Sequence, residues 1–172
     1  MPRVCRSLLL WLGLLMLAVS PGLPQEHPAQ PQPVYAQASR TLLETYVQQQ
    51  RSWNHYFTTI ASEQRNQEQI QPQEKYRRFL AETLSQWRQL TPLPSCQSAH
   101  RLYELGFVSY GVAADFRLTF LYARSTWLGS PSTALSLAEE RSRHYTTRGD
   151  DYFQQAATLA QAHGCVGTST SP

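Results

Sequence analysis

Residues 96–165 read CQSAHRLYELGFVSYGVAADFRLTFLYARSTWLGSPSTALSLAEERSRHYTTRGDDYFQQAATLAQAHGC. This stretch begins at Cys96, ends at Cys165 and contains Gly129-Ser130-Pro131 at its centre. Each cysteine lies 34 residues from the nearer of Ser130 and Pro131. Serine followed by proline is typical of a helix N-terminus, and glycine before it interrupts the preceding helix. We therefore predict two long antiparallel helices that turn here and bring the cysteines together at their open end.

The two cysteines are predicted to form a disulfide bond. Cys5, the third cysteine of the chain, precedes an apolar run and leaves with the leader described below. The remaining pair, Cys96 and Cys165, is even in number, and paired cysteines of an exported protein are usually oxidised. A crosslink that closes a loop of roughly 70 residues stabilises a fold by roughly 4 kcal/mol. The alternative is two free thiols or a reactive site.

The N-terminus has the pattern of a secretory signal. Arg3 and Arg6 precede an apolar run at residues 7–19, and a Pro/Gly-rich break follows. We predict a signal peptide at 1–22, a disordered Pro/Gln-rich lead-in at 23–33, a helical bundle at 34–165 and a flexible tail at 166–172. The apolar run is shorter than the roughly 20 residues that span a bilayer. A secreted or periplasmic protein is expected, and a membrane anchor formed by an uncleaved leader is the alternative.

The charge of the chain argues against some classes of partner. There are 15 Lys and Arg residues against 12 Asp and Glu residues, and loss of Arg3 and Arg6 reduces the net charge from +3 to about +1. Binding to nucleic acid or to an anionic membrane surface needs a dense basic patch. We expect neither a nucleic-acid partner nor a stable membrane span after signal cleavage.

Helical periodicity precedes the cysteine-bounded stretch as well. Apolar residues recur at three- and four-residue steps from residue 34 to about 67, and again from Pro72 to Leu90. Pro72 suits the first position of a helix, so the second helix is expected to be short, about half the length of the first. The fold class predicted is all-α, an antiparallel up-and-down four-helix bundle with a short second helix and one disulfide.

The third helix is expected to be the central one. Residues 105–114 carry no charge, and a helix that is apolar on most sides is buried by several neighbours. If the last two helices mirror each other about the turn, Gly149 faces Val112 and lies next to Gly111. Two glycines at one level predict a close approach of the two backbones.

A metal site at the disulfide end is one candidate. His100 and Glu104 are four residues apart on one helix face, and His163 is expected near them at the end of the last helix. Two imidazoles and a carboxylate could hold a transition metal such as zinc or iron. The favoured interpretation is that they are exposed polar residues, with no metal and no cofactor.

A second candidate is Asp115, which lies in the most apolar helix. A buried carboxylate needs a partner, so we predict a buried ion pair with Arg143 or Arg117. The alternative is an acid/base group in a pocket. The many tyrosines and tryptophans are expected to be core residues, with a ligand pocket as the alternative.

No catalytic motif was found in the sequence. It contains no Gly-x-Ser-x-Gly elbow, phosphate-binding loop or His-Glu-x-x-His helix, so we predict a protein that is not an enzyme. The leading functional hypothesis is a non-catalytic interaction module, an accessory subunit or adaptor that binds another extracytoplasmic protein. The alternative is a carrier that binds a small molecule or a metal in the bundle.

Overall fold

The computed structural model describes residues 32–60, 66–126 and 133–165. Within these ranges the chain is helical and contains no strand, which confirms the all-α prediction. The segments predicted as a signal peptide, as most of the lead-in, as the turn at Gly129-Ser130-Pro131 and as the tail lie outside the described residues. The elements are α2 (Gln32–His55), the π-helix η1 (Tyr56–Ile60), α3 (Asn66–Arg88), the 3-10 helix η2 (Pro94–Cys96), α4 (Gln97–Thr126) and α5 (Thr133–Ala162).

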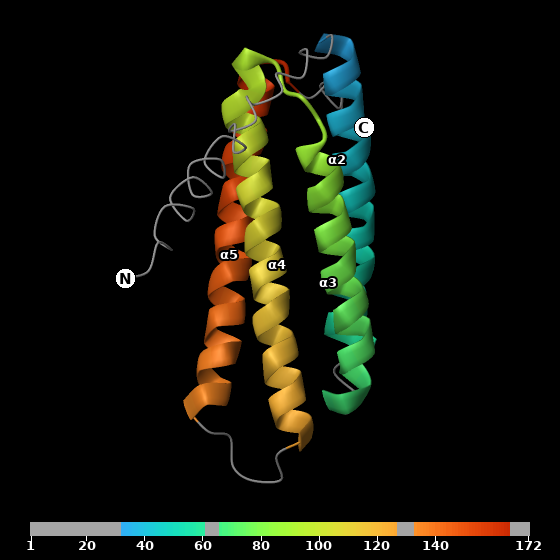
Figure 1. Ribbon diagram of the computed structural model, residues 1–172, viewed down its shortest axis with the longest axis vertical. Coiled ribbons are helices and arrows are strands. Elements are labelled where there is room, and N and C mark those ends of the chain that lie inside the picture. The colour runs from blue at the N-terminus through green and yellow to red at the C-terminus, as the bar shows by residue number, and fades with distance from the viewer. Residues whose placement is uncertain (1–31, 61–65, 127–132, 166–172) are drawn as a thin grey trace, which may run out of the picture.

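The four long helices lie side by side, and each runs opposite to the one before it in the chain (Figure 1). Helix α4 lies between α5 and α3 and has twelve buried residues, against five on α5. This agrees with its central place in the sequence-based prediction. None of the helices described is both long enough and apolar enough to cross a membrane.

The prediction that the second helix is short is wrong. Helix α3 has 23 residues, nearly as many as the 24 of α2, and Pro72 lies inside it instead of at its start. The buried stripe of α3 explains the difference, because it begins before the proline. Its members are Gln69, Gln73, Tyr76, Leu80, Thr83 and Trp87. A proline costs one backbone hydrogen bond, and burial of this continuous stripe offsets that cost.

Aromatic side chains attach α2 to the other helices. The ring centroid of Tyr46 on α2 lies 4.9 Å from Phe107 on α4, 5.2 Å from Phe153 on α5 and 6.0 Å from Phe79 on α3. The Phe107 ring meets Tyr46 edge-on, the Phe153 ring is tilted and the Phe79 ring is nearly parallel to it, and rings at such separations attract one another beyond the effect of burial. One tyrosine therefore contacts all three other long helices.

The cysteines meet at the open end of the α4–α5 pair, as the matched distances predict. Their sulfur atoms lie at bonding distance and their Cα atoms are 5.5 Å apart, within the usual range for a disulfide. Gly164 ends α5 in the left-handed conformation with φ +62°, and the Cys165 amide donates to the Ala160 carbonyl at 2.8 Å. This helix end directs Cys165 inward, because the backward hydrogen bond holds the chain against the last turn.

The close approach of α4 and α5 involves Gly149, but its partner is Gly106 and not Gly111. A Cβ atom at Gly106 would overlap the Phe153 ring and lie 3.5 Å from the Gly149 carbonyl oxygen. A Cβ atom at Gly149 would lie 3.1 Å from the Tyr110 ring, whereas one at Gly111 would meet nothing within 4 Å. The mirror rule was wrong here, because it places Gly149 opposite Val112 and Gly106 lies six residues, about 9 Å along the helix, from that position.

Two alanine substitutions test this assignment. We expect Gly106→Ala to lower the free energy of unfolding by about 1 to 3 kcal/mol, because the Phe153 ring has to move. Gly111→Ala is the matched control, and we expect it to be neutral or to stabilise by up to about 1 kcal/mol through helix propensity. Urea denaturation followed by circular dichroism measures both. Equal effects of the two substitutions would contradict the assignment.

Candidate functional site

The three residues of the metal hypothesis have separate roles in the structure. His100 is buried and stacks on the Trp87 ring, with centroids 4.8 Å apart. The Glu104 carboxylate accepts a hydrogen bond from Arg88 at 2.6 Å. His163 is exposed just after the end of α5. His100 is therefore not the exposed polar residue that we predicted, and across the described ranges no three His, Cys, Asp or Glu side chains form a group able to hold a metal.

The buried His100 ring is held in its neutral form. Burial raises the pKa of Tyr35 to about 12, so its hydroxyl stays protonated. This hydroxyl shares a hydrogen bond of 3.2 Å with His100 Nδ1, and the histidine tautomer decides which of the two donates. Burial also lowers the pKa of His100 below its ordinary value, and the nearby Glu104 carboxylate opposes only part of that shift.

This arrangement predicts a pH dependence of stability. The unfolded chain binds a proton at His100 near pH 6.5, whereas the folded chain binds it only at lower pH. The free energy of unfolding should therefore fall as the pH drops below about 6.5, and be fully restored above it. Urea denaturation at pH 7.5 and 5.5 should show a larger loss for the natural protein than for His100→Gln. The exposed His144 provides the control, because His144→Gln should retain the full pH dependence; equal slopes for all three proteins would contradict the prediction.

Asp115 does not form the buried ion pair that we predicted. Its side chain is 54% exposed, and its partner is Arg77 from α3. Arg143 pairs instead with Glu139 on its own helix at 2.7 Å. The prediction was wrong because the charge-free stretch ends at Ala114, and the next residue already faces solvent beside α3.

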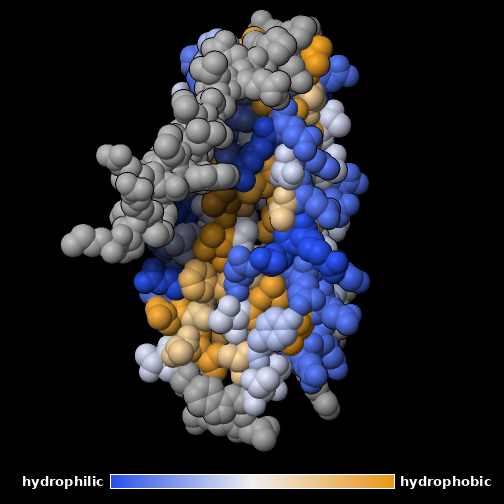
Figure 2. Space-filling view, in the orientation of Figure 1, coloured by the Kyte–Doolittle hydropathy of each residue, from blue (hydrophilic) through white to orange (hydrophobic). Residues whose placement is uncertain are grey.

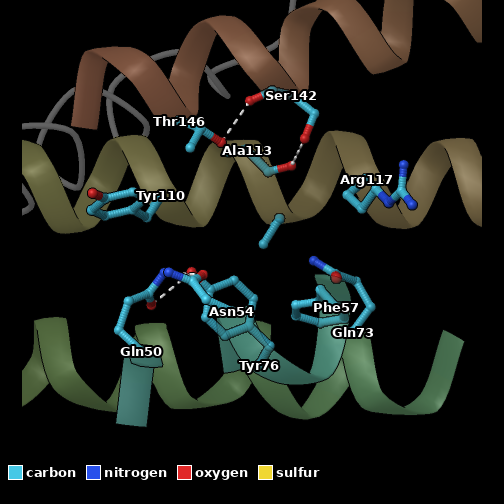
Figure 3. Close-up of a pocket in the computed structure, with 11 residues that line it drawn as sticks. Gln50, Asn54, Phe57, Gln73, Tyr76, Tyr110, Ala113, Arg117, Ser142 and Thr146 are labelled. Carbon is cyan, nitrogen blue, oxygen red and sulfur yellow. Dashed lines mark hydrogen bonds between the residues drawn. The ribbon is translucent and has the colours of Figure 1, made fainter. Parts of the chain in front are cut away.

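A cavity of about 220 Å³ lies between the four long helices (Figure 3). Each of α2, α3, α4 and α5 contributes to its wall, and so does η1. The lining residues are Gln50, Asn54, Phe57, Gln73, Tyr76, Tyr110, Ala113, Ala114, Arg117, Ser142 and Thr146. Ala113 and Ala114 on α4 have small side chains, and a larger side chain at either position would fill the cavity. Most of the other lining residues are polar, and two of them, Asn54 and Thr146, are exposed, so the cavity opens to solvent.

The hydroxyl groups of the cavity wall already donate hydrogen bonds within the protein. Tyr76 donates to Gln50 Oε1 at 2.9 Å, and Tyr110 donates to the Asp150 carboxylate. Ser142 donates to the Ala113 carbonyl at 2.9 Å, and Thr146 donates to the Ser142 carbonyl at 2.9 Å. Each hydroxyl oxygen keeps lone pairs that can accept from a ligand.

Buried tyrosines surround this network. Burial raises the pKa of Tyr76 to about 12, and the pKa values of Tyr46 and Tyr110 rise further for the same reason. The Tyr46 hydroxyl lies close to that of Tyr110 but has no hydrogen-bond partner among the described residues. These phenols therefore stay neutral at physiological pH and supply no anionic group.

Gln73 is one of several lining residues that the sequence analysis did not single out. Its side chain is only 4% exposed, its amide points toward the cavity in Figure 3, and it forms no hydrogen bond with the described residues. Gln73 lies three residues before Tyr76 and seven before Leu80, so the helical period could have placed it on the buried stripe. Arg117 also lines the cavity, where we had considered it only as a partner for Asp115.

An apolar groove runs where α3 and α4 meet on the surface. Hydrophobic side chains line this face between hydrophilic borders (Figure 2). Leu84, Val108 and Val112 form part of the groove, and Arg77 and Arg78 lie beside them. The large hydrophobic residues with the greatest exposure are elsewhere: Val34, Val47, Tyr122 and Leu137 are spread over three helices.

Comparisons with models of protein families, with curated proteins and with solved structures find no match for this chain.

Proposed function

We propose that this protein is an exported, non-catalytic carrier, an antiparallel up-and-down four-helix bundle that binds a small polar molecule in the cavity between its long helices. The observation that carries the proposal is the Gln73 side chain, which is 4% exposed, lines the cavity and has no hydrogen-bond partner among the described residues. A ligand in the cavity can form a hydrogen bond with this amide in place of water. Export is supported by the signal-like N-terminus and by the paired cysteines.

The chemistry of the wall supports binding over catalysis. Its tyrosines are neutral, and the hydroxyl of Ser142 donates to a carbonyl instead of to a base. Nucleophilic catalysis needs a hydroxyl or thiol within reach of a base, and the lining residues described supply no such pair.

An interaction module remains the second candidate, and the α3–α4 groove supports it. The groove combines an apolar floor with the Arg78 guanidinium, which has no partner among the described residues. A protein partner with an apolar side chain and an acidic neighbour would fit such a surface.

Cavity-filling substitutions separate the two functions. We expect saturation-transfer NMR with a library of small polar metabolites to identify a ligand of the natural protein. Binding should be lost in Ala114→Leu, which fills the cavity, and in Thr146→Leu, which narrows it from the more exposed α5 side. Ala81→Leu fills the α3–α4 groove instead and should leave ligand binding intact.

The carrier proposal fails if the natural protein binds no member of the library. It also fails if binding survives in folded Ala114→Leu and Thr146→Leu proteins, with circular dichroism as the measure of folding. Loss of binding in Ala81→Leu alone would move the site to the groove and favour the interaction module.

A further inference from the structure

We propose that the ligand of this cavity is a small carboxylate with a flat apolar body, and that Gln73 and Arg117 hold its carboxylate group. The inference rests on the proposed carrier function and names the class of ligand. Four features of the cavity support it: the hydrogen-bond donors that remain free, the charge at one end, the register of α3 against α4, and the size and walls of the space.

The donors that remain free in the wall call for a ligand rich in acceptors. The hydroxyl groups of Tyr76, Tyr110, Ser142 and Thr146 already donate hydrogen bonds to acceptors within the protein. The Gln73 amide and the Arg117 guanidinium keep their N–H groups, because neither forms a hydrogen bond with the described residues. Amide and guanidinium N–H groups together suit a carboxylate, and the guanidinium can bind both oxygens at once.

Charge is unbalanced at the Arg117 end of the cavity. Arg117 is half-buried and lies over the Phe120 ring at 5.1 Å, with Arg124 over the same ring at 5.5 Å. Glu139, the nearby carboxylate, is already paired with Arg143 at 2.7 Å. Burial lowers the pKa of Arg117, the nearby Glu139 carboxylate raises it, and Arg124 and Arg143 lower it. Glu139 therefore offsets part of the cost of burying Arg117, and an anionic ligand beside the guanidinium would offset more of it.

The register of α3 against α4 brings the two donors to one level. Arg77 contacts Asp115 across the antiparallel pair. Gln73 is four residues earlier on α3, so it lies near the level of Thr119, about 3 Å along the axis from Arg117. Both side chains line the same cavity, and Figure 3 shows them toward the same end of it, away from Tyr110.

The size and the walls of the cavity define the rest of the ligand. The volume of about 220 Å³ is below the range of drug-sized sites, so the ligand is small. Phe57 and Tyr76 pack edge to face on each other, with ring centroids 5.7 Å apart. Together with the methyl groups of Ala113 and Ala114 they form an apolar part of the wall, against which an aromatic body can pack. Tyr110 lies about 10 Å from Arg117 along α4, and its oxygen could accept from a hydroxyl at the far end of the ligand.

Three probes of similar shape and different charge test whether the cavity prefers a negatively charged ligand. Isothermal titration calorimetry with 4-hydroxybenzoate, neutral 4-hydroxybenzamide and cationic 4-hydroxybenzylamine should show the carboxylate binding tightest. Arg117→Gln should weaken its binding about tenfold or more, because a hydrogen bond to a charged group is lost. Arg124→Gln is the matched control, since Arg124 lies over the same ring but does not line the cavity, and it should change the affinity by less than about threefold. Gln73→Leu should weaken carboxylate binding as well.

The outcomes separate the ligand class from the carrier function. Tighter binding of the amide or the amine, lost in Thr146→Leu, would overturn the carboxylate and leave the carrier intact. Equal effects of Arg117→Gln and Arg124→Gln would also overturn it, since long-range charge would then explain the preference. If none of the three probes binds while the metabolite library yields an uncharged or cationic ligand of the cavity, the carboxylate is again wrong. If none of the three probes and no member of the metabolite library binds, both the carboxylate proposal and the carrier proposal are wrong.

Discussion

Replacing Trp87 with alanine is expected to lower the free energy of unfolding by about 3 to 5 kcal/mol. The Trp87 side chain is 0% exposed, and its indole N–H donates to the His100 carbonyl at 3.0 Å. Its ring also packs on Tyr103 and Phe107, with centroids 5.1 Å and 5.7 Å away. Truncation would leave a large void between α3 and α4 that these rings cannot fill. Urea denaturation followed by circular dichroism measures the loss.

Two variants serve as controls for Trp87→Ala. Trp87→Phe keeps an aromatic ring and loses the N–H donor, so it should cost less, about 1 to 3 kcal/mol. Leu137→Ala truncates a side chain that is 49% exposed on α5 and should change stability by no more than about 0.5 kcal/mol. A loss below about 1 kcal/mol for Trp87→Ala would contradict the burial and packing of this residue.

The second large effect is expected at the cysteines. The double substitution Cys96→Ser/Cys165→Ser should lower the free energy of unfolding by roughly 2 to 5 kcal/mol. The two residues are 69 positions apart in sequence and both are buried at the open end of α4 and α5. A crosslink over so long a loop restricts the unfolded chain strongly, and its loss also leaves two buried hydroxyls in place of a packed sulfur pair. Denaturation with and without reductant provides the measurement.

Separate measurements show whether the crosslink itself is responsible. Mass spectrometry of the unreduced protein should find two hydrogens fewer than the reduced chain. Reductant should lower the denaturation midpoint of the natural protein and leave that of the double serine variant unchanged. Cys5→Ser is the control, because we place Cys5 in the leader, and it should have no effect on the mature protein. A natural protein that does not respond to reductant would refute the disulfide.

Sequence reasoning was accurate for features that depend on local chemistry. Gly164 closes α5 in the left-handed conformation because glycine has no Cβ to oppose it. Pro72 shows the limit of such rules, since proline is tolerated inside α3 when the helix packs well on both sides of it. The sequence analysis named only apolar residues as the buried face of this helix, although Gln69 and Gln73 belong to its buried stripe.

The site could be predicted only in part, for a related reason. Asp115 and Arg117 were both recognised as charged residues in an apolar helix, but their partners were misjudged. Asp115 forms an ion pair with Arg77 on α3, and Arg117 lines the cavity instead of pairing with Asp115. Which arginine meets which carboxylate depends on how α3 is rotated and shifted against α4, and eight residues of connection do not restrict that rotation.

By itself the sequence determined that the chain is helical, that α5 ends at Gly164 and that Cys96 and Cys165 come together. Helical period, proline and glycine act over a few residues, and two helices of equal length on either side of a turn can only end at the same level. The tertiary structure decided the cavity, the neutral His100 and the free Arg117. Each of these depends on the relative rotation of helices distant in the chain, which is settled by the packing of large side chains such as Tyr46, Phe107 and Phe153.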